Sequence, residues 1–553
     1  MAVPVLNIPT QELRKRPKPY LKVKHLQRWV SELPTANTSR STQQLLDQLK
    51  TINRSRYPAH ERIRLLDTLR PTARELLLQL RQPLKNSKLP LDRKQKEAAQ
   101  TIQKILEEMA AGYKSVVSQL ILRDSLKESD EMLLREAIYN SIQYLARRLV
   151  ESYLIYAPEP YDIWRELHQL YNYAEQNNFH DLPIDDPYPD YMLPVAYTIE
   201  LVYKRILLLA IASPYHLMQN EAEELYQLFS PWSYECHIYP AIEQGPKNKF
   251  VFDLSGDLPP RYFTRDMGWE PINGQVLDIK AVCARLENLL QQFSYQDTID
   301  DMPPLIELQK RDMLIRLTQA LEGSQSRKSV RQSAGDNVHI TVGINAAHHF
   351  VSQKIPFTPE MDELKLNGQQ NLDPAMFANA YKTALENDRR HSHMDYTIYN
   401  WKQNNTSATG SALNCSLDND EQAVKVGELV AYCAEEKACE RWKVGLIRWI
   451  KFQTESGIDM GVMNLSHTAV PVAVKAIKGM GRGTNYFRGL MIPKQVSINQ
   501  MRSLVVPATL YDVNSILAIN MKNRFFYIKL TQQCLSTRSF SQFEFDVLDN
   551  GNG

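Results

Sequence analysis

Apolar residues recur at intervals of three and four positions through most of the first 320 residues. This spacing is typical of amphipathic helices. Leu45, Leu46 and Leu49 begin the series, and residues 65–69 repeat it. Longer helices are expected at about 92–124, 130–155, 195–212, 219–230, 276–295 and 302–322. The first 320 residues are therefore expected to be mostly α-helical, with a split into two sub-domains near residue 155 as one option.

The pattern changes after a polar segment at 323–336. Val338, Ile340, Val342 and Ile344 then alternate with other residues, and this period of two is typical of a β-strand. Further strands are expected at about 424–430, 442–449, 457–463, 470–477, 516–520, 524–530 and 540–548. Many short strands separated by turns predict a sandwich or a small barrel. Glycines between 479 and 489 mark a break between two β units.

The expected fold class is α+β and multidomain, with an α-helical N-terminal region followed by an antiparallel β-barrel and a second small β unit. Residues 14–19 alternate basic residues with proline, which disfavours a helix, so the chain is expected to begin with an extended arm. The polar stretch 358–400 is expected to be an insertion between strands. The expected divisions are a basic arm at 1–40, a helical region at 41–322, an arginine-bearing linker at 323–336, a β-barrel at 337–480 and a small β unit at 485–550.

The composition is that of an ordinary globular protein, with 43% hydrophobic and 23% charged residues. This excludes a wholly disordered chain. No apolar run approaches the roughly 18 to 20 residues that a membrane span requires, and no apolar signal segment stands at the N-terminus. We therefore expect a cytoplasmic protein without a membrane span.

Charge is distributed unevenly along the chain. Residues 1–100 contain 21 Lys and Arg against 8 Asp and Glu, whereas residues 151–310 contain 10 against 25. Such asymmetry can mark a contact with nucleic acid or an acidic protein, or an attraction between neighbouring sub-domains. Few aromatic residues interleave with the basic ones, so nucleic-acid binding is the least favoured class of function.

The sequence contains no signature of a common catalytic site. A P-loop, a dinucleotide fingerprint, HExxH and GxSxG are all missing, so we expect no enzyme and no cofactor. His348 with His349, and His391 with His393, lack a carboxylate or cysteine that would complete a metal site. The six cysteines include no CxxC pair and are expected to be reduced thiols, mostly buried.

Two short motifs flank strands of the first β unit. Arg327 and Arg331 form an RxxxR pair in the linker, just before the strand that contains Val338. Asn405, Ser407 and Gly410 fit the pattern [DN]xSxxG. Each motif alone is weak, since Asn, Ser and Gly together usually mark a turn. The two motifs in this order on one β unit are far more specific.

With these motifs the chain resembles the PilZ family, bacterial receptors for cyclic di-GMP, over roughly residues 325–478. The segments Val426–Val430, Trp442–Trp449 and Ile458–Val462 are similar to the later strands of the PilZ barrel. The resemblance implies a small six-stranded β-barrel here. Residues 485–550 are a candidate for a second, degenerate barrel of similar kind.

The resemblance also implies roles for the motif residues. Arg327 and Arg331 would bind phosphate and guanine, Asn405 and Ser407 would contact a second base edge, and Gly410 would permit a close approach. The chemistry suits the ligand, because a guanidinium binds phosphate oxygens bidentately and can donate to guanine O6 and N7. No metal and no catalytic residue is implied.

The sequence departs from the family pattern in the spacing of the two motifs. Arg331 and Asn405 are 74 positions apart, and the insertion must account for the excess. Arg389 and Arg390 lie nearer to Asn405 and are an alternative arginine pair. Arg327 and Arg331 are preferred because they immediately precede the first strand.

The expected function is that of a non-enzymatic cyclic di-GMP receptor. Ligand binding would order the 323–336 linker and change the contact between the helical region and a protein partner, whose identity the sequence does not give. The resemblance implies a setting in bacterial surface behaviour, such as motility, pili, secretion or biofilm. The alternative is an interaction scaffold with a PilZ-like barrel that binds no nucleotide, in which salt bridges occupy Arg327 and Arg331.

Overall fold

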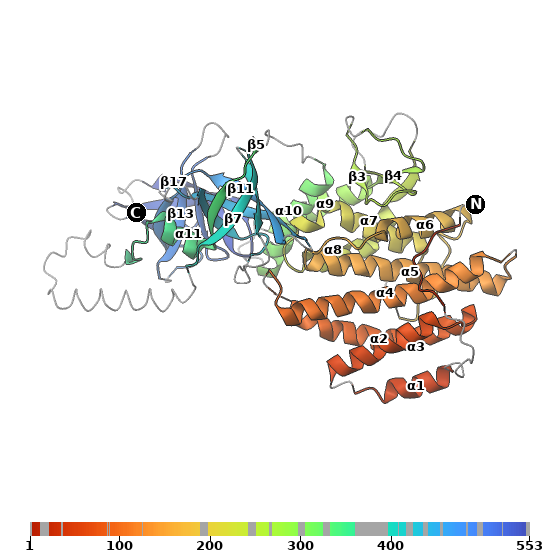
Figure 1. Cartoon of the computed structure of the whole chain (residues 1–553). Coiled ribbons are helices and arrows are strands. Elements are labelled where there is room, and N and C mark those ends of the chain that lie inside the picture. The colour runs from red at the N-terminus through yellow and green to blue at the C-terminus, as the bar shows by residue number, and fades with distance from the viewer. Residues whose placement is uncertain are drawn as a thin grey trace. The chain divides into compact units, whose positions relative to one another are not determined.

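The computed structural model divides into two compact units (Figure 1). One consists of Met1–Ser87, Leu91–Tyr295 and Leu314–Gln325, and the other of Lys88–Pro90, Gln296–Met313 and Ser326–Gly553. The structure describes residues 3–11, 22–34, 37–85, 87, 89–123, 125–188, 197–241, 250–264, 268–296, 305–323, 332–359, 396–407, 409–415, 424–434, 441–453, 457–482, 485–494, 501–521 and 524–548.

Helices dominate the N-terminal half, which confirms the helical expectation. They are α1 (Val23–Ser31), α2 (Thr38–Arg54), α3 (Ala59–Arg81), α4 (Arg93–Ile121), α5 (Glu128–Leu154), α6 (Ile163–Gln176), α7 (Ile199–Ile211), α8 (Glu221–Trp232), α9 (Lys280–Gln296) and α10 (Leu305–Leu321), with short 3₁₀ turns η1 (Gln82–Leu84), η2 (Pro214–His216) and η3 (Ser233–Glu235). The leucines that predict α2 and α3, among them Leu45, Leu49 and Leu66, lie fully buried in one core.

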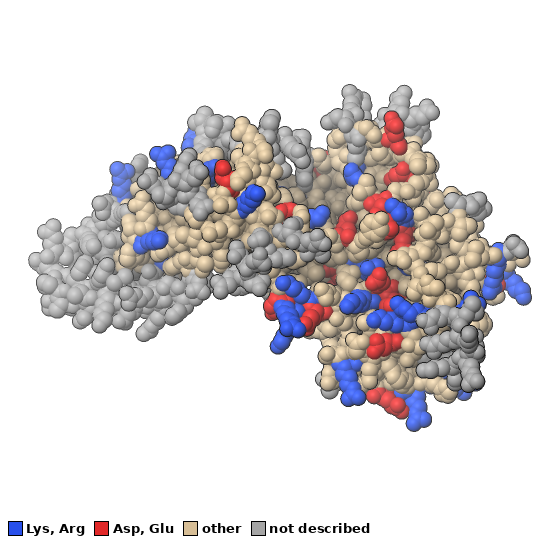
Figure 2. Space-filling view, in the orientation of Figure 1, with Lys and Arg blue, Asp and Glu red and all other residues tan. Residues whose placement is uncertain are grey.

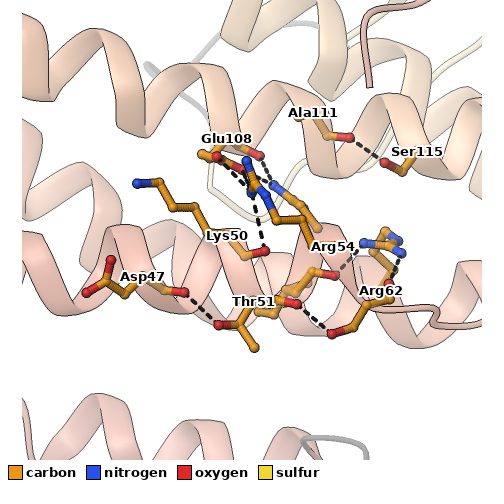
Figure 3. A network of polar contacts seen from close by, with 11 residues as sticks. Asp47, Lys50, Thr51, Arg54, Arg62, Glu108, Ala111 and Ser115 are labelled. Carbon is orange, nitrogen blue, oxygen red and sulfur yellow. Dashed lines mark hydrogen bonds and ion pairs between the residues drawn. The ribbon is translucent and has the colours of Figure 1, made fainter. Parts of the chain in front are cut away.

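The crossing of α2 with α4 is fixed by buried polar contacts (Figure 3). The Glu108 carboxylate accepts hydrogen bonds from Asn53 Nδ2 at 2.8 Å and from Arg54 Nη1 at 3.1 Å. The buried Arg62 guanidinium donates to the carbonyls of Ile52 and Ser55, both at 2.8 Å. These carbonyls lie at the C-terminal end of α2, where a cation is favourable. Polar side chains therefore set the geometry at both places.

The expected arm at 1–40 is only partly extended. Residues 3–11 contain neither helix nor strand, but α1 occupies Val23–Ser31. In α1 the buried Leu26 and the partly buried Trp29 and Val30 pack on the core of α2–α4. Arg14–Pro19, on which the expectation of an extended arm rested, lie outside the described residues. The basic residues around α1 conceal its apolar stripe in the sequence.

Ion pairs join the basic and acidic parts of the first unit. Arg70 and Asp186 approach to 2.8 Å with both side chains buried, and Arg81 pairs with Glu151. The visible face of this unit also carries Lys and Arg close to Asp and Glu (Figure 2). At these two pairs, the uneven distribution of charge along the sequence therefore produces an attraction within the first unit.

A small antiparallel sheet follows η3, where the sequence suggests an irregular connection with short strands. It consists of β1 (His237–Pro240), β2 (Phe250–Asp253), β3 (Arg261–Tyr262) and β4 (Gly274–Asp278), in the order β1-β4-β2-β3. His168 of α6 lies fully buried, with Nδ1 2.6 Å from Tyr203 Oη and Nε2 2.9 Å from the Leu258 carbonyl. Burial lowers the pKa of His168 to about 4. This neutral imidazole ties α6 to α7 and to the loop after β2.

The predicted barrel lies in the second unit. Its strands are β5 (Gln332–Ser333), β6 (Asn337–Val342), β7 (Tyr399–Ser407), β8 (Gly410–Cys415), β9 (Leu429–Ala434), β10 (Lys443–Gln453) and β11 (Gly457–Ser466). The sheet order β7-β6-β9-β10-β11-β8 is closed into a six-stranded barrel by pairing of β7 with β8, and β5 pairs with the end of β7. The strand pairs are antiparallel.

A second closed barrel follows directly. Its strands β12 (Val470–Lys478), β13 (Phe487–Ile492), β14 (Ser503–Pro507), β15 (Ile516–Met521), β16 (Arg524–Ser536) and β17 (Phe540–Leu548) pair in the order β12-β13-β14-β17-β16-β15. In both barrels the strands, numbered along the chain, follow the order first, second, third, sixth, fifth, fourth. The barrel expected at 337–480 includes residues 470–478, but these residues form β12 of the second barrel. Alternation predicts a strand there but does not reveal its partners.

Helix α11 (Ile344–Val351) joins the two barrels. The alternating pattern suggested that Ile344 continues the strand. Gly343, however, has a φ of +94°, a conformation that favours glycine, and the helix begins directly after it. Ala347 and Phe350 of α11 share one apolar core with Leu429 of β9 and Leu490 of β13. The two barrels are therefore packed together around α11.

Two further observations concern cysteines and membrane spans. Cys433 is disulfide-bonded, which corrects the expectation of reduced thiols at this position. Cys236, Cys283, Cys415 and Cys534 are free. Within the described parts of the chain, none of the helices has the length and apolar character that crossing a bilayer requires.

Candidate functional site

The three residues of the second motif lie together on the hairpin of β7 and β8. Ser407 at the end of β7 pairs with Gly410 at the start of β8, and Asn405 pairs with Ala412. The two arginines of the first motif, Arg327 and Arg331, lie outside the described residues. The alternative pair at 389–390 also lies outside them.

Asn405 and Ser407 occupy the outer face of the barrel. Gln403 Nε2 lies 2.9 Å from Ser411 Oγ, and Thr406 Oγ1 lies 3.2 Å from the same buried oxygen. Because side chains alternate along a strand, the residues that flank Thr406 point the other way. Asn405 Oδ1 is shielded from solvent and has no hydrogen-bond partner among the described residues. The Asn405 amide oxygen can therefore accept a hydrogen bond that none of the described residues supplies.

Ser407 and Gly410 shape the hairpin itself. Ser407 Oγ accepts a hydrogen bond from the Gly410 N–H at 3.2 Å. A Cβ atom added to Gly410 would lie 2.6 Å from the Val462 carbonyl oxygen of β11. Glycine therefore permits β11 to approach β8 closely, which gives this residue a structural reason in addition to the role that the motif predicts.

A polar network inside the barrel supports the hairpin from beneath. Ser411 Oγ lies 3.2 Å from Tyr432 Oη, which donates to Asn464 Oδ1. Asn464 Nδ2 donates to the Ser407 carbonyl at 3.4 Å, and its N–H donates to the Thr409 carbonyl at 3.0 Å. Burial raises the pKa of Tyr432, so it stays a neutral donor. The chain positions of the motif are thus fixed by β8, β9 and β11 together.

The sequence pattern does not predict this network. Its signal is the presence of polar residues at strand positions that face the barrel interior, namely Ser411, Tyr432 and Asn464. Their facing directions follow only from the register of three strands, which the sequence pattern does not supply.

Strand β5 brings the end of the linker to the motif. Gln332 pairs with Thr406, and Ser333 pairs with Asn405. Arg331 directly precedes Gln332 in the sequence. Gln332 and Ser333, the linker residues that directly follow Arg331, are therefore paired with the strand that carries the [DN]xSxxG motif.

The outer face beside Asn405 has a floor of small residues. Asn405 of β7, Ala412 of β8, Gly461 of β11 and Trp449 of β10 are successive partners across four strands. A Cβ atom on Gly461 would lie 1.9 Å from Trp449 Nε1, so the indole lies directly over this glycine. The half-buried ring of Trp449 thus borders a shallow surface that begins at Asn405.

The histidines considered as metal ligands in the sequence, where the structure describes them, pack against other side chains. His348 of α11 is buried, and burial beside Arg488 lowers its pKa to about 3. The ring of His349 stacks on Tyr396 with centroids 4.3 Å apart. His391 and His393 lie outside the described residues, and the described part of the chain holds no cluster of three or more potential metal ligands.

A closed six-stranded barrel with this hairpin motif defines a PilZ-type domain, and comparison with known proteins agrees. Residues 24–241 match the family model described as "Cyclic-di-GMP receptor FimW, N-terminal domain". Residues 249–380 and 359–471 match "Cyclic-di-GMP receptor FimW, middle PilZ domain", and residues 472–548 match "FimW C-terminal beta-barrel domain". The chain therefore belongs to the family of PilZ-domain proteins that these models describe.

The chain is also similar to a curated protein from Pseudomonas aeruginosa named cyclic-di-GMP receptor FimW. The two are 25% identical over 558 residues, which cover 94% of this chain and 90% of the relative. No solved structure matches the chain. The C-terminal match starts at residue 472, within β12, in agreement with the assignment of this strand to the second barrel.

Proposed function

We propose that this protein is a cyclic di-GMP receptor and that the ligand binds on the outer face of β7 and β8, at Asn405, Ser407 and Gly410. The pairing of β5 with β7 carries the proposal, since it holds the end of the arginine-bearing linker against this motif. The name of the Pseudomonas aeruginosa relative gives independent support.

Arg327 and Arg331 are the proposed clamp. Continuing the antiparallel register of Gln332 with Thr406 by one residue would put position 331 opposite Ser407. Two guanidinium groups can then hold a phosphate and donate to guanine O6 and N7. The pair at 389–390 is less favoured, because in the sequence it leads into β7 at Tyr399, the end of the strand opposite to Asn405. Six residues of strand, about 20 Å, separate Tyr399 from Asn405.

The floor beside Asn405 suits a planar base. The small side chain of Ala412 leaves space above the sheet, and the Trp449 indole that covers the neighbouring Gly461 supplies an aromatic surface beside it. Base–aromatic stacking contributes about 1–3 kcal/mol per base. The uncommitted Oδ1 of Asn405 would accept from the edge of a base stacked there.

The proposed output is a change in the protein's contact with a partner. The division between the two units falls in the linker, between Gln325 and Ser326. A ligand that engages the linker arginines would restrict this connection, and a partner of the helical unit would sense the restriction. Ligand binding shifts such an equilibrium only if the two states bind the ligand with different affinities. The setting that we propose is bacterial surface behaviour, without catalysis by this chain.

Isothermal titration calorimetry with cyclic di-GMP tests the proposal. The full chain is expected to bind, the Arg327→Ala/Arg331→Ala variant to lose at least about 100-fold in affinity, and the Arg389→Ala/Arg390→Ala variant to bind normally. These two variants remove the same charge and serve as matched controls. Loss of binding only in the second variant would move the clamp to 389–390. An absence of heat with the wild-type chain would leave an interaction scaffold as the function.

A further inference from the structure

The N-terminal residues lie against helix α6 as an extended segment (Figure 1). The Val5 N–H donates to Gln169 Oε1 at 2.7 Å, and the Asn7 N–H donates to Glu166 Oε1 at 2.6 Å. Glu166 and Gln169 are three positions apart on α6 and so share one face. The higher-numbered residue of the segment contacts the lower-numbered residue of α6, so the segment runs antiparallel to the helix.

Burial alternates along the segment. Pro4 is buried and Leu6 and Ile8 are partly buried, whereas Val5 and Asn7 are exposed. This period of two is that of an extended strand with one side on the protein and one in solvent. The side chains of Pro4, Leu6 and Ile8 therefore face the protein, and the N–H groups of the residues between them donate hydrogen bonds to side chains of α6.

The acceptor for Asn7 is a built site. The Glu166 side chain is 7% exposed, and Lys114 Nζ of α4 holds both of its oxygens, at 2.6 and 2.8 Å. This buried ion pair fixes the carboxylate and leaves Oε1 aimed at the segment. Hydrogen bonds to an ionised acceptor are about twice as strong as neutral ones. A carboxylate that is held by a buried lysine and directed at a backbone amide is a recognition device for extended peptide.

We infer that this face of α6 is a docking groove for an extended segment of a partner protein, and that residues 3–11 occupy it in the resting chain. The recognised chemistry is a strand-like peptide with apolar side chains at alternate positions and free N–H groups between them. Because the contacts shown are to backbone N–H groups, other sequences with this pattern fit the same groove. The inference does not depend on cyclic di-GMP binding.

The tethered segment acts as a competitor. Because residues 3–11 and α6 belong to one chain, their contact is intramolecular, and linked segments reach effective concentrations of about millimolar. The apparent affinity for a partner in trans is therefore the intrinsic affinity multiplied by the fraction of chains whose groove is empty. Removal of the segment should raise the affinity for any peptide that uses the groove.

Fluorescence anisotropy of a labelled synthetic peptide with the sequence of residues 3–11 tests the inference. A chain that lacks residues 1–11 is expected to bind it saturably, and the full chain to bind it at least about tenfold more weakly. Methylation of the peptide nitrogens of Val5 and Asn7 is expected to abolish binding, whereas methylation at Leu6 is the matched control. In the shortened chain, Gln169→Ala is expected to weaken binding, and Gln176→Ala, at the end of the same helix, to leave it unchanged.

Circular dichroism shows whether the shortened chain keeps its fold. If it does not, the full-length Pro4→Asp variant, which keeps the segment but loses the buried proline, gives the same comparison. A folded chain that does not bind the peptide, or binding that survives methylation at Val5 and Asn7, would overturn the inference. A concentration-dependent dimer of the full chain that the Pro4→Asp variant lacks would assign the groove to a second copy instead.

Discussion

The two barrels of the second unit have the same strand connectivity and different contents. The first carries Asn405 and Ser407 on its outer face and holds the polar network of Ser411, Tyr432 and Asn464 inside. The second is built around an apolar core that includes Val474, Leu504, Leu517, Ile519 and Ile528. An arginine-bearing linker leads into the first barrel, whereas only His467, Thr468 and Ala469 connect β11 with β12.

The outer faces of the two barrels differ in how far other segments of the chain cover them. On the second barrel, Arg488 of β13 lies over the ring of Phe357, and Asn520 of β15 donates to the Pro359 carbonyl at 2.9 Å. Segments that follow α11 thus cover this barrel. On the first barrel, the face at Asn405 and Ser407 stays partly exposed. One connectivity therefore serves two purposes, the proposed ligand face in the first barrel and a support in the second.

The largest expected effect comes from removing the support. A chain that ends at Ser466 would expose Phe350, Leu429, Ala431 and Trp442, which the shared core now buries. An apolar patch of this kind leads to aggregation. We expect the shortened chain to be insoluble or to lack cooperative unfolding, as measured by circular dichroism and proteolysis. A soluble first barrel with a sharp thermal transition would show that the two barrels are independent.

Acid should destabilise both units through one buried histidine each. The folded-state pKa values of His168 and His348 are about 4 and about 3, below the ordinary value of 6.5, because burial disfavours the charged form. The folded protein then binds fewer protons than the unfolded one. Stability is complete above pH 6.5 and falls as the pH decreases toward 4 and 3 respectively.

The expected loss is on the order of 3 kcal/mol for each histidine. Urea unfolding at pH 7 and pH 4.5 measures it, with His348→Asn expected to flatten the pH dependence of the barrel transition. His339→Asn, on the surface of β6, is the control. An equal loss in wild type and His348→Asn would contradict this account.

Substitutions inside the two barrels should have different effects on ligand affinity, although each lowers the free energy of unfolding only moderately. Tyr432→Phe removes the hydroxyl that donates to Asn464 Oδ1 and contacts Ser411 Oγ, which costs about 0.5–1.5 kcal/mol for each hydrogen bond lost. It should also weaken cyclic di-GMP binding, because the network holds the motif hairpin. Ile519→Val in the second barrel costs about 0.5–1.5 kcal/mol and should leave affinity unchanged. Equal affinities for the two variants in calorimetry would show that the network is not coupled to the ligand face.

The smallest effect is expected at the floor of the ligand face. Trp449→Phe retains an aromatic ring over Gly461 and should reduce affinity by no more than about threefold. Trp449→Ala removes the ring and should cost about tenfold, within the range of base–aromatic stacking. Unchanged affinity in Trp449→Ala would place the base elsewhere on the barrel.

The sequence predicts much of this architecture, because local periodicity reports burial. Val338, Ile340 and Val342 indicate β6, and the leucines of α2 and α3 indicate their helices. Pairing is a different kind of information. The alternation of apolar residues in β12 is the same whichever barrel the strand joins. Helix α11 begins after Gly343, whose positive φ ends the strand, and apolar periodicity alone does not reveal this change.

The candidate site shows the same limit. The pattern of Asn405, Ser407 and Gly410 is local, and the structure brings these three residues together on one hairpin. The network beneath them and the approach of Trp449 to Gly461 depend on the register of strands far apart in sequence. The arginine positions remain a prediction that the binding experiments decide.

Hydrogen–deuterium exchange with and without saturating cyclic di-GMP tests the central claim most directly, since both barrels are read in one experiment. The account predicts that the ligand slows exchange in peptides that cover residues 326–337 and 399–415, and leaves β12 and β15 of the second barrel unchanged. Protection confined to the second barrel, or bound ligand that protects neither β7 nor β8, would contradict it.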